Sequence, residues 1–174
     1  MDVNETIYGR RSIRRYTDQA IDSEVLENLL DAARWAPNGG NRNPWRFVVV
    51  TSPVQKRLLL KFTPGVDDMP AAIVIICIEM KQARVKETAR LVYMADAAIA
   101  AQNMALAGHS LGLGSCMVVS FADAALRTLL SLPDRVAPYL ILTLGYPDES
   151  PEPPPRRAIR EIAFMEEYGQ EWAR

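Results

Sequence analysis

The stretch "AARWAPNGGNRNPWRFVVV", residues 32–50, holds the clearest sign of how this chain folds. Its first residues end an apolar pattern of helical spacing, and Asp22 or Ser23 can cap the start of that helix. Two prolines and two glycines then stop the helix, and "WRFVVV", residues 45–50, is typical of a short buried strand. The sequence therefore predicts a polar loop between a surface helix and a core strand.

Similar signals continue on both sides, with short connections and no internal repeat. Further strands are expected at "AAIVIICI", "GSCMVV" and "YLILTLG", residues 71–78, 114–119 and 139–145. Further helices are expected over residues 2–8, 53–62 and 88–111, after a capping-box-like pair of Ser120 and Asp123, and from Ala158. This alternation predicts one α/β-type unit.

The end of the chain differs in composition from the rest. "YPDESPEPPPRR" is too rich in proline to form regular structure. We therefore expect a single domain over residues 1–174, in which residues 146–174 form an extended C-terminal arm with a short helix.

Composition excludes several functional classes. With 174 residues and 49% hydrophobic content, the chain can bury a full core. The 20 Lys and Arg against 21 Asp and Glu create no general field for nucleic acid or membranes. Polar residues interrupt the apolar stretch 91–113, which favours a buried helix over a membrane span. One His and two separated Cys predict no metal site, and the absence of a signal-peptide pattern at the N-terminus favours the cytoplasm.

A cluster of arginines stands out against this balanced charge. "GRRSIRRYT", residues 9–17, carries four arginines in six positions. They could form a solvated basic turn paired with carboxylates, or an anion site in which Ser12 adds a donor to the planar guanidinium groups. Nucleotide motifs of the Gly-x-Gly-x-x-Gly or P-loop type are missing, and few aromatic residues interleave. A single small phosphate compound is the better ligand, although binding of an acidic protein or RNA stays open as an alternative.

Four blocks of the chain together resemble a known family. "RRSIRRY", "AARWAPNGGNRNPWRFVVV", "ADAAIAAQNMALAGHSLGLGSCMV" and "LTLGYPDESPEPPPRRAIREI" occur in the order and spacing of the nitroreductase-like flavoprotein family, and they cover nearly the whole chain. The resemblance implies an α+β fold, a three-layer α-β-α sandwich with a central mixed sheet flanked by helices. It also implies an FMN cofactor and a homodimer whose site is built between two subunits. The alanine-rich helix 88–111 suits a partner helix, but it would equally suit a buried core helix.

The resemblance also implies which residues hold FMN. The first block meets the phosphate and ribityl chain, and one arginine returns to the phosphate after the proline-rich arm. The asparagine loop, residues 38–43, meets the isoalloxazine edge, with Trp45 as packing. The Gly-Leu-Gly segment, residues 112–114, offers backbone N–H groups to the ring. The implied cofactor-binding residues are Arg10, Arg11, Ser12, Arg14, Asn38, Asn41, Asn43, Gly112, Leu113, Gly114, Ser115 and Arg156. Two of them depart from the family pattern, since Asn38 replaces a usual Ser and Asn43 replaces a usual Gln. The shorter reach at position 43 could change the substrate side.

The function implied by the resemblance is FMN-dependent NAD(P)H oxidoreduction. NADPH or NADH would deliver a hydride to the flavin, which would then pass two electrons to a nitroaromatic, quinone, flavin or similar small acceptor in a ping-pong sequence. No catalytic side chain is expected: we interpret the lone His109 as structural and Cys116 as a buried inert thiol. Residues 61–70 could form a short lid. The main alternative is a flavin-binding sensor or carrier without nicotinamide-linked turnover.

Overall fold

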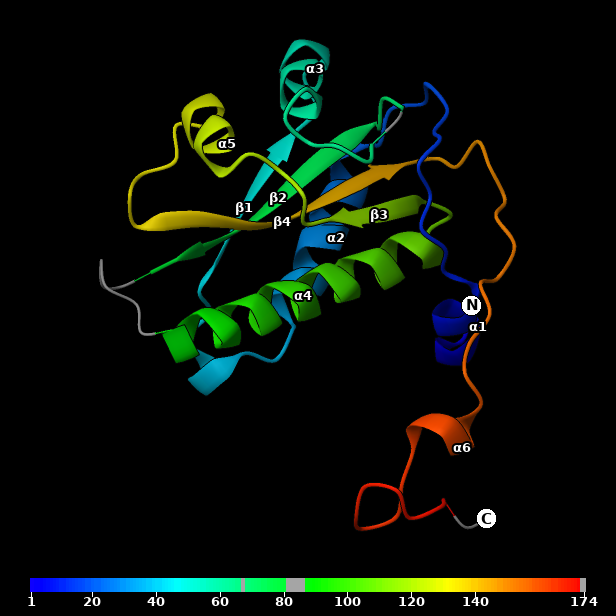
Figure 1. Cartoon of the computed structure of the whole chain (residues 1–174). Helices are drawn as coiled ribbons and strands as arrows, with labels where there is room; N and C mark the ends of the chain where they lie inside the picture. The colour runs from blue at the N-terminus through cyan, green and yellow to red at the C-terminus, as the bar shows by residue number, and fades with distance from the viewer. Residues whose placement is uncertain (67, 81–86, 173–174) are drawn as a thin grey trace.

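A four-stranded antiparallel sheet forms the centre of the protein (Figure 1). The computed structural model describes residues 1–66, 68–80 and 87–172. The strands β1 (Trp45–Val50), β2 (Ala72–Glu79), β3 (Gly114–Val118) and β4 (Val136–Gly145) lie in the order β1-β2-β4-β3. All three neighbouring pairs are antiparallel.

The expected three-layer α+β arrangement is confirmed, but the sheet is antiparallel instead of mixed. Strands β2 and β3 run in the same direction and are joined through helix α4 (Glu87–Ser110). Because β4 inserts between them and runs opposite to both, these two strands never pair with each other. Among the described residues, the parallel contact that does occur is a single bridge between Ser12 and Ser115.

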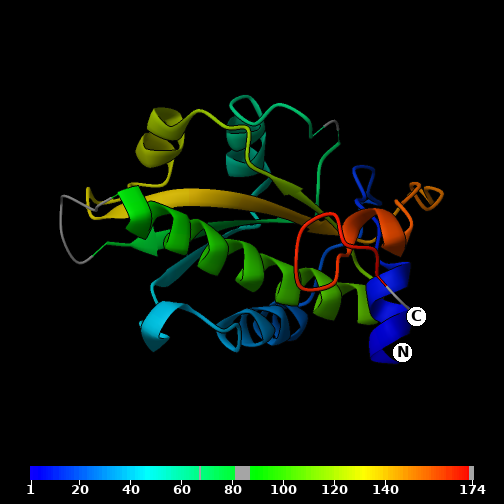
Figure 2. The same ribbon diagram turned by 60° about the horizontal axis from the view of Figure 1, so that its bottom comes forward.

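Helices cover both faces of the sheet (Figures 1 and 2). Helix α2 (Ser23–Arg34) and α4 lie on one face, while α3 (Pro53–Leu60) and α5 (Asp123–Leu129) lie on the other. The side chains of β2 alternate between the two cores, because successive residues of a strand point to opposite faces. Val74 and Ile76 join the cluster of α2 and α4, and Ile75 joins the cluster on the other face. This two-sided burial explains the unbroken apolar run in β2.

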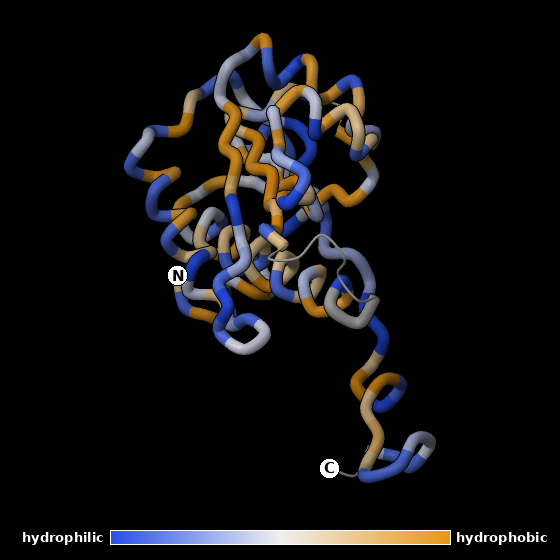
Figure 3. The backbone as a smooth tube through the Cα atoms, turned by 90° about the vertical axis from the view of Figure 1, so that its left-hand side faces the viewer, coloured by the Kyte–Doolittle hydropathy of each residue, from blue (hydrophilic) through white to orange (hydrophobic). Residues whose placement is uncertain are grey.

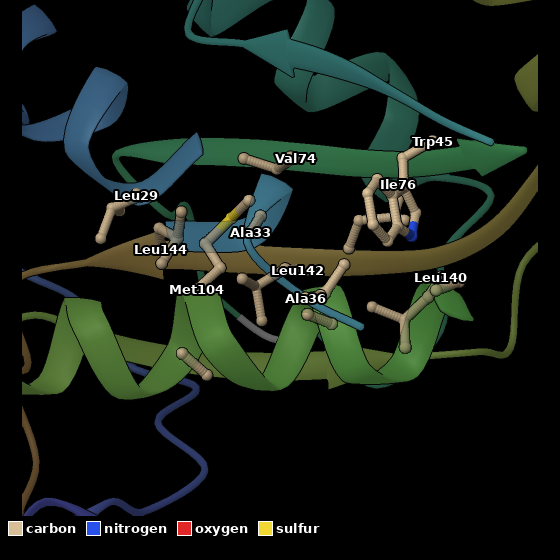
Figure 4. Close-up of a cluster of buried hydrophobic side chains, with 14 of the residues drawn as sticks. Leu29, Ala33, Ala36, Trp45, Val74, Ile76, Met104, Leu140, Leu142 and Leu144 are labelled. Atoms are coloured by element: carbon tan, nitrogen blue, oxygen red, sulfur yellow. The ribbon is translucent and has the colours of Figure 1, made fainter. Parts of the chain in front are cut away.

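Figure 4 shows the core between the sheet and the helices α2 and α4. Leu29 of α2 and Met104 of α4 face Leu142 and Leu144 of β4, and all four side chains are buried. The small residues of α4 on this face, including the fully buried Ala100 and Ala101, allow the helix to lie close to the sheet.

The helix starts agree with the sequence in one case and differ in another. Helix α1 (Val3–Gly9) begins with a capping box in which the Asp2 side chain accepts from the backbone N–H of Glu5, and Glu5 returns the contact. The capping box predicted from Ser120 and Asp123 is wrong. Helix α5 begins later, with Ala122 as N-cap, and the Ser120 hydroxyl donates instead to the carbonyl of Pro64, 3.3 Å away.

The chain after β4 leaves the body of the protein (Figures 1 and 3). Residues 150–162 are exposed and include the short helix α6 (Ile159–Ile162). Its apolar side chains are also exposed, together with Tyr168 and Trp172. Within the described ranges, no helix is both long and apolar enough to cross a membrane.

Candidate functional site

The arginine segment, residues 9–17, lies against the edge of the sheet beside β3. The backbone N–H of Ile13 donates to the carbonyl of Ser115 over 2.9 Å. The side chain of Ile13 is buried against Gly114, where an added Cβ would lie only 2.7 Å from the Cβ of Ile13. Because Ile13 points inward, its neighbours Ser12 and Arg14 are exposed on the outer side.

The Gly-Leu-Gly segment, residues 112–114, connects the end of α4 to β3 and lies against the arginine segment. Gly112 makes the turn after α4 with a φ of 82°, which favours glycine. The backbone N–H groups of Gly112 and Leu113 donate to the carbonyls of His109 and Gly108, at 3.0 and 2.8 Å. These two donors are therefore already occupied by the end of α4, while Gly114 and Ser115 pair with β4. The segment contacts the arginine segment through packing and through the Ser115 carbonyl.

A cavity of about 330 Å³ brings the two ends of the chain together. It is lined by Arg10, Arg11, Ser12, Arg14, Pro151, Glu152, Pro154 and Arg156. In the part of the chain that the structure describes, Arg10, Arg14 and Arg156 form no ion pair with a carboxylate. Four arginines outnumber the one carboxylate, of Glu152, around this hollow, and such an excess of guanidinium groups suits a small dianion such as a phosphate. Sequence reasoning predicted this set of arginines, but it did not identify Glu152 in the lining.

The asparagine loop borders a second, larger cavity of about 760 Å³. Asn38, Asn41, Asn43 and Trp45 contribute to its lining, together with Trp35. The Asn38 side-chain oxygen accepts from the backbone N–H of Asn43 over 2.9 Å, so these two residues close the loop on themselves. Asn41 and Asn43 adopt φ values of 50° and 48°, a region that asparagine tolerates better than most residues.

Asp96 in α4 fastens this loop at both ends. Its Oδ1 accepts from the backbone N–H of Gly39 over 3.0 Å, and its backbone carbonyl accepts from the indole N–H of Trp45 over 3.0 Å. Gly39 must be small here, because a Cβ would lie 2.6 Å from Cγ1 of Val92. Asp96 is 4% exposed, and its Oδ2 has no hydrogen-bond partner among the described residues. Sequence reasoning missed this role: Asp96 is one of the polar residues that interrupt the apolar stretch 91–113, and that interruption was the signal that could have identified it.

The two groups of predicted residues lie at opposite ends of α4 (Figure 1). The asparagine loop contacts Asp96, whereas Gly9, just before the arginines, lies against His109 in the last turn. The axial rise of a helix separates these two helix positions by roughly 20 Å. One chain therefore does not bring the arginines and the asparagines together.

Two titratable groups near the arginines, His109 and Cys116, are held in their neutral forms. Burial lowers the pKa of His109, which is half-buried, and the nearby Arg10 and Arg11 lower it further. Burial raises the pKa of the Cys116 thiol, which is 4% exposed. A thiol with a raised pKa is a poor nucleophile, in agreement with the interpretation of Cys116 as inert.

Comparisons with known proteins agree on one family. The family model described as the Nitroreductase family matches residues 7–68 and 61–146. A protein of Methanothermobacter thermautotrophicus, whose name gives NADH dehydrogenase and NAD(P)H nitroreductase as candidate activities, is 37% identical over 162 residues, covering 87% of this chain and 80% of that protein. An FMN reductase (NADPH) of Bacillus subtilis is 29% identical over 161 residues, covering 82% of this chain and 65% of that protein. A solved nitroreductase family protein of Clostridium difficile superposes with a TM-score of 0.84 at 32% identity, covering 96% of this chain and 99% of the other.

Proposed function

The chain belongs to the nitroreductase family, and on this premise we propose that it is an FMN-dependent NAD(P)H oxidoreductase that reduces a small acceptor in a ping-pong sequence. The observation that carries the proposal is the convergence of Arg10, Ser12, Arg14 and Arg156 on one cavity. FMN, when bound, supplies the two-electron transfer between the nicotinamide and the acceptor.

The arginine cavity fits the phosphate end of FMN. Arg10, Arg14 and Arg156 present guanidinium groups that can bind phosphate oxygens in pairs, and the exposed hydroxyl of Ser12 adds a donor. Arg11 is partly committed, because its Nη1 donates to the carbonyl of Tyr8 over 2.6 Å. The segment that the family resemblance assigns to the ring lies beside the arginines instead, with two of its N–H groups already bonded to the end of α4, so it would shape this end of the site: Gly112, Leu113, Gly114 and Ser115.

The asparagine loop fits the polar edge of a flat ring. Carboxamide side chains both donate and accept hydrogen bonds, as the imide edge of an isoalloxazine requires. Asn38 and Asn43 are joined to each other within the loop, which leaves Asn41 as the residue best placed to bind a ligand edge. Donors aimed at this edge would stabilise negative charge on the reduced ring.

Two subunits would combine these two ends into one site. The five-carbon ribityl chain of FMN is short compared with the roughly 20 Å between the parts of α4 that carry the arginines and the asparagines. We therefore propose a homodimer in which the arginine cavity of one chain faces the asparagine loop of its partner. The exposed Leu91, Met94 and Ile99 of α4 and the exposed apolar residues of the arm support this assembly, because such surfaces mark interaction sites.

No side chain is assigned a chemical step in the reaction. The residues of this chain bind and orient the cofactor, and the acceptor could be a nitroaromatic, a quinone or a flavin. Either NADPH or NADH could serve as donor. The reduced thiols Cys77 and Cys116 support a cytoplasmic location.

The visible absorption spectrum of the purified protein tests the proposal. We expect a yellow protein whose flavin absorption bleaches on anaerobic addition of NADPH or NADH and returns when an acceptor is added. Yellow protein that neither nucleotide bleaches would instead indicate a flavin-binding sensor or carrier, or another electron donor. Colourless protein that cannot be reconstituted with FMN would overturn the assignment.

A further inference from the structure

We propose that Tyr16 is a positioning residue that sets the preference of this protein for FMN over riboflavin, by holding the backbone between Ser12 and Arg14. The inference rests on the proposed function, because it assumes that the arginine cavity receives the FMN phosphate. Tyr16 lines neither cavity, so it would act through the segment that it holds.

The phenol of Tyr16 lies inside the protein and is tied to the centre of the arginine segment. Tyr16 is 5% exposed, and its hydroxyl donates to the backbone carbonyl of Ile13 over 2.5 Å. The same oxygen lies 2.7 Å from Oγ1 of Thr143, which is fully buried in β4. Burial raises the pKa of this phenol, so it remains a hydroxyl donor at neutral pH.

The hydrogens of this network can be counted. Two hydroxyl groups, of Tyr16 and Thr143, serve two carbonyl oxygens, of Ile13 and Cys116, and also contact each other. Two hydroxyl hydrogens cannot serve three hydrogen-bonding contacts, so one of these three links must lack a hydrogen. The link from Thr143 to the Cys116 carbonyl is the longest at 3.3 Å. Tyr16 therefore donates to Ile13, and Thr143 donates to Tyr16.

Packing keeps the ring of Tyr16 in one place. Gly145 lies directly beneath it, since a Cβ at that position would be 2.7 Å from Cδ1 of the ring. The next backbone N–H, of Thr17, donates to the carbonyl of Tyr146 over 2.9 Å. The ring of Tyr16 therefore packs against β4, and its hydroxyl holds the carbonyl of Ile13 in place.

The Ile13 peptide is held on both of its polar groups. Its N–H is held by Ser115 and its carbonyl by Tyr16, while Ser12 and Arg14 project outward on either side. Guanidinium and hydroxyl groups recognise phosphate only when their donors point correctly, and a fixed backbone lowers the ordering cost of binding. Loss of the phenol hydroxyl would leave the Ile13 carbonyl without its donor and loosen the phosphate cavity, without touching the asparagine loop.

Equilibrium binding of FMN and of riboflavin to the apoprotein tests the inference, read by quenching of flavin fluorescence. Tyr16→Phe keeps the ring and removes the hydroxyl. We expect its Kd for FMN to rise roughly fivefold or more, while its Kd for riboflavin changes by less than about twofold. Thr143→Val should shift the ratio in the same direction, and Thr143→Ser should restore the parent ratio because the donor to Tyr16 returns.

Tyr139→Phe is the matched control, since it removes a hydroxyl from a half-buried tyrosine of β4, the strand that carries Thr143. An unchanged FMN-to-riboflavin ratio in folded Tyr16→Phe would overturn the inference. If that variant does not fold, an unchanged ratio in Thr143→Val would do the same. A parent protein that binds both flavins equally would refute the phosphate assignment itself, and with it the proposed role of the arginines.

Discussion

Removing the Asp96 carboxylate should weaken flavin binding more strongly than it lowers the stability of the fold. In Asp96→Ala the backbone N–H of Gly39 loses its acceptor, a hydrogen bond to a carboxylate worth about 1.5–3 kcal/mol. The substitution also removes the unpartnered Oδ2, which offsets part of that loss. A net destabilisation of about 1 kcal/mol corresponds to a fall in Tm of about 2–4 °C for a chain of this size.

The effect on flavin binding should be larger than the effect on Tm. Asn41 and Asn43 hold left-handed backbone conformations that each cost on the order of 1 kcal/mol, and the anchored loop maintains them. In Asp96→Ala the N–H of Gly39 is no longer held. We therefore expect the Kd values for FMN and riboflavin to rise together by about tenfold, because the loop meets the ring that both ligands share. Asp96→Asn keeps an oxygen for Gly39 and should stay close to the parent protein.

The assay is a titration of both flavins into each variant, together with thermal unfolding of the apoproteins. Parent-like binding of both flavins by Asp96→Ala, with a lowered Tm, would show that Asp96 stabilises the fold without shaping the site. A selective loss of FMN binding would place the asparagine loop at the phosphate end, which contradicts the arrangement proposed above.

Three further outcomes are expected. The double variant Arg10→Ala with Arg14→Ala should shed FMN while its thermal unfolding stays near that of the parent apoprotein, because Arg14 is exposed, Arg10 is half-buried and neither forms an ion pair within the described residues. Co-purified flavin at the parent ratio would contradict their assignment. Ala98→Trp, on an exposed position of α4, should lower the molecular mass measured by light scattering, whereas Ala124→Trp on α5 should not, and equal masses for all three proteins would refute α4 as the dimer helix. The N–H groups of Arg14 and Arg15 hold the pKa of Glu149 below its ordinary value, so its contribution to stability is present above the unfolded-state pKa and is lost as the pH falls through the lower folded-state pKa. Glu149→Gln should accordingly show a smaller fall in Tm between pH 5 and pH 3, and parallel profiles would exclude this role.

Local chemistry explains what could be predicted from sequence. The unbroken run in β2 and the Pro-Gly punctuation before β1 depend on residues close together in the chain, so strand β1 was predicted with its observed bounds, Trp45–Val50. The arginine spacing likewise allowed an anion site as one of two interpretations, because guanidinium geometry is a property of the side chain itself.

Contacts between distant residues could not be predicted in the same way. The amino-acid sequence by itself determined the elements, the apolar faces and the types of donor available, since those follow from side-chain chemistry and helical or strand period. Only the tertiary structure decided that β4 lies between β2 and β3, that Tyr16 reaches Ile13 and Thr143, and that Asp96 fastens the asparagine loop. It also placed the arginines and asparagines at opposite ends of α4, because packing of the whole chain sets which surfaces meet.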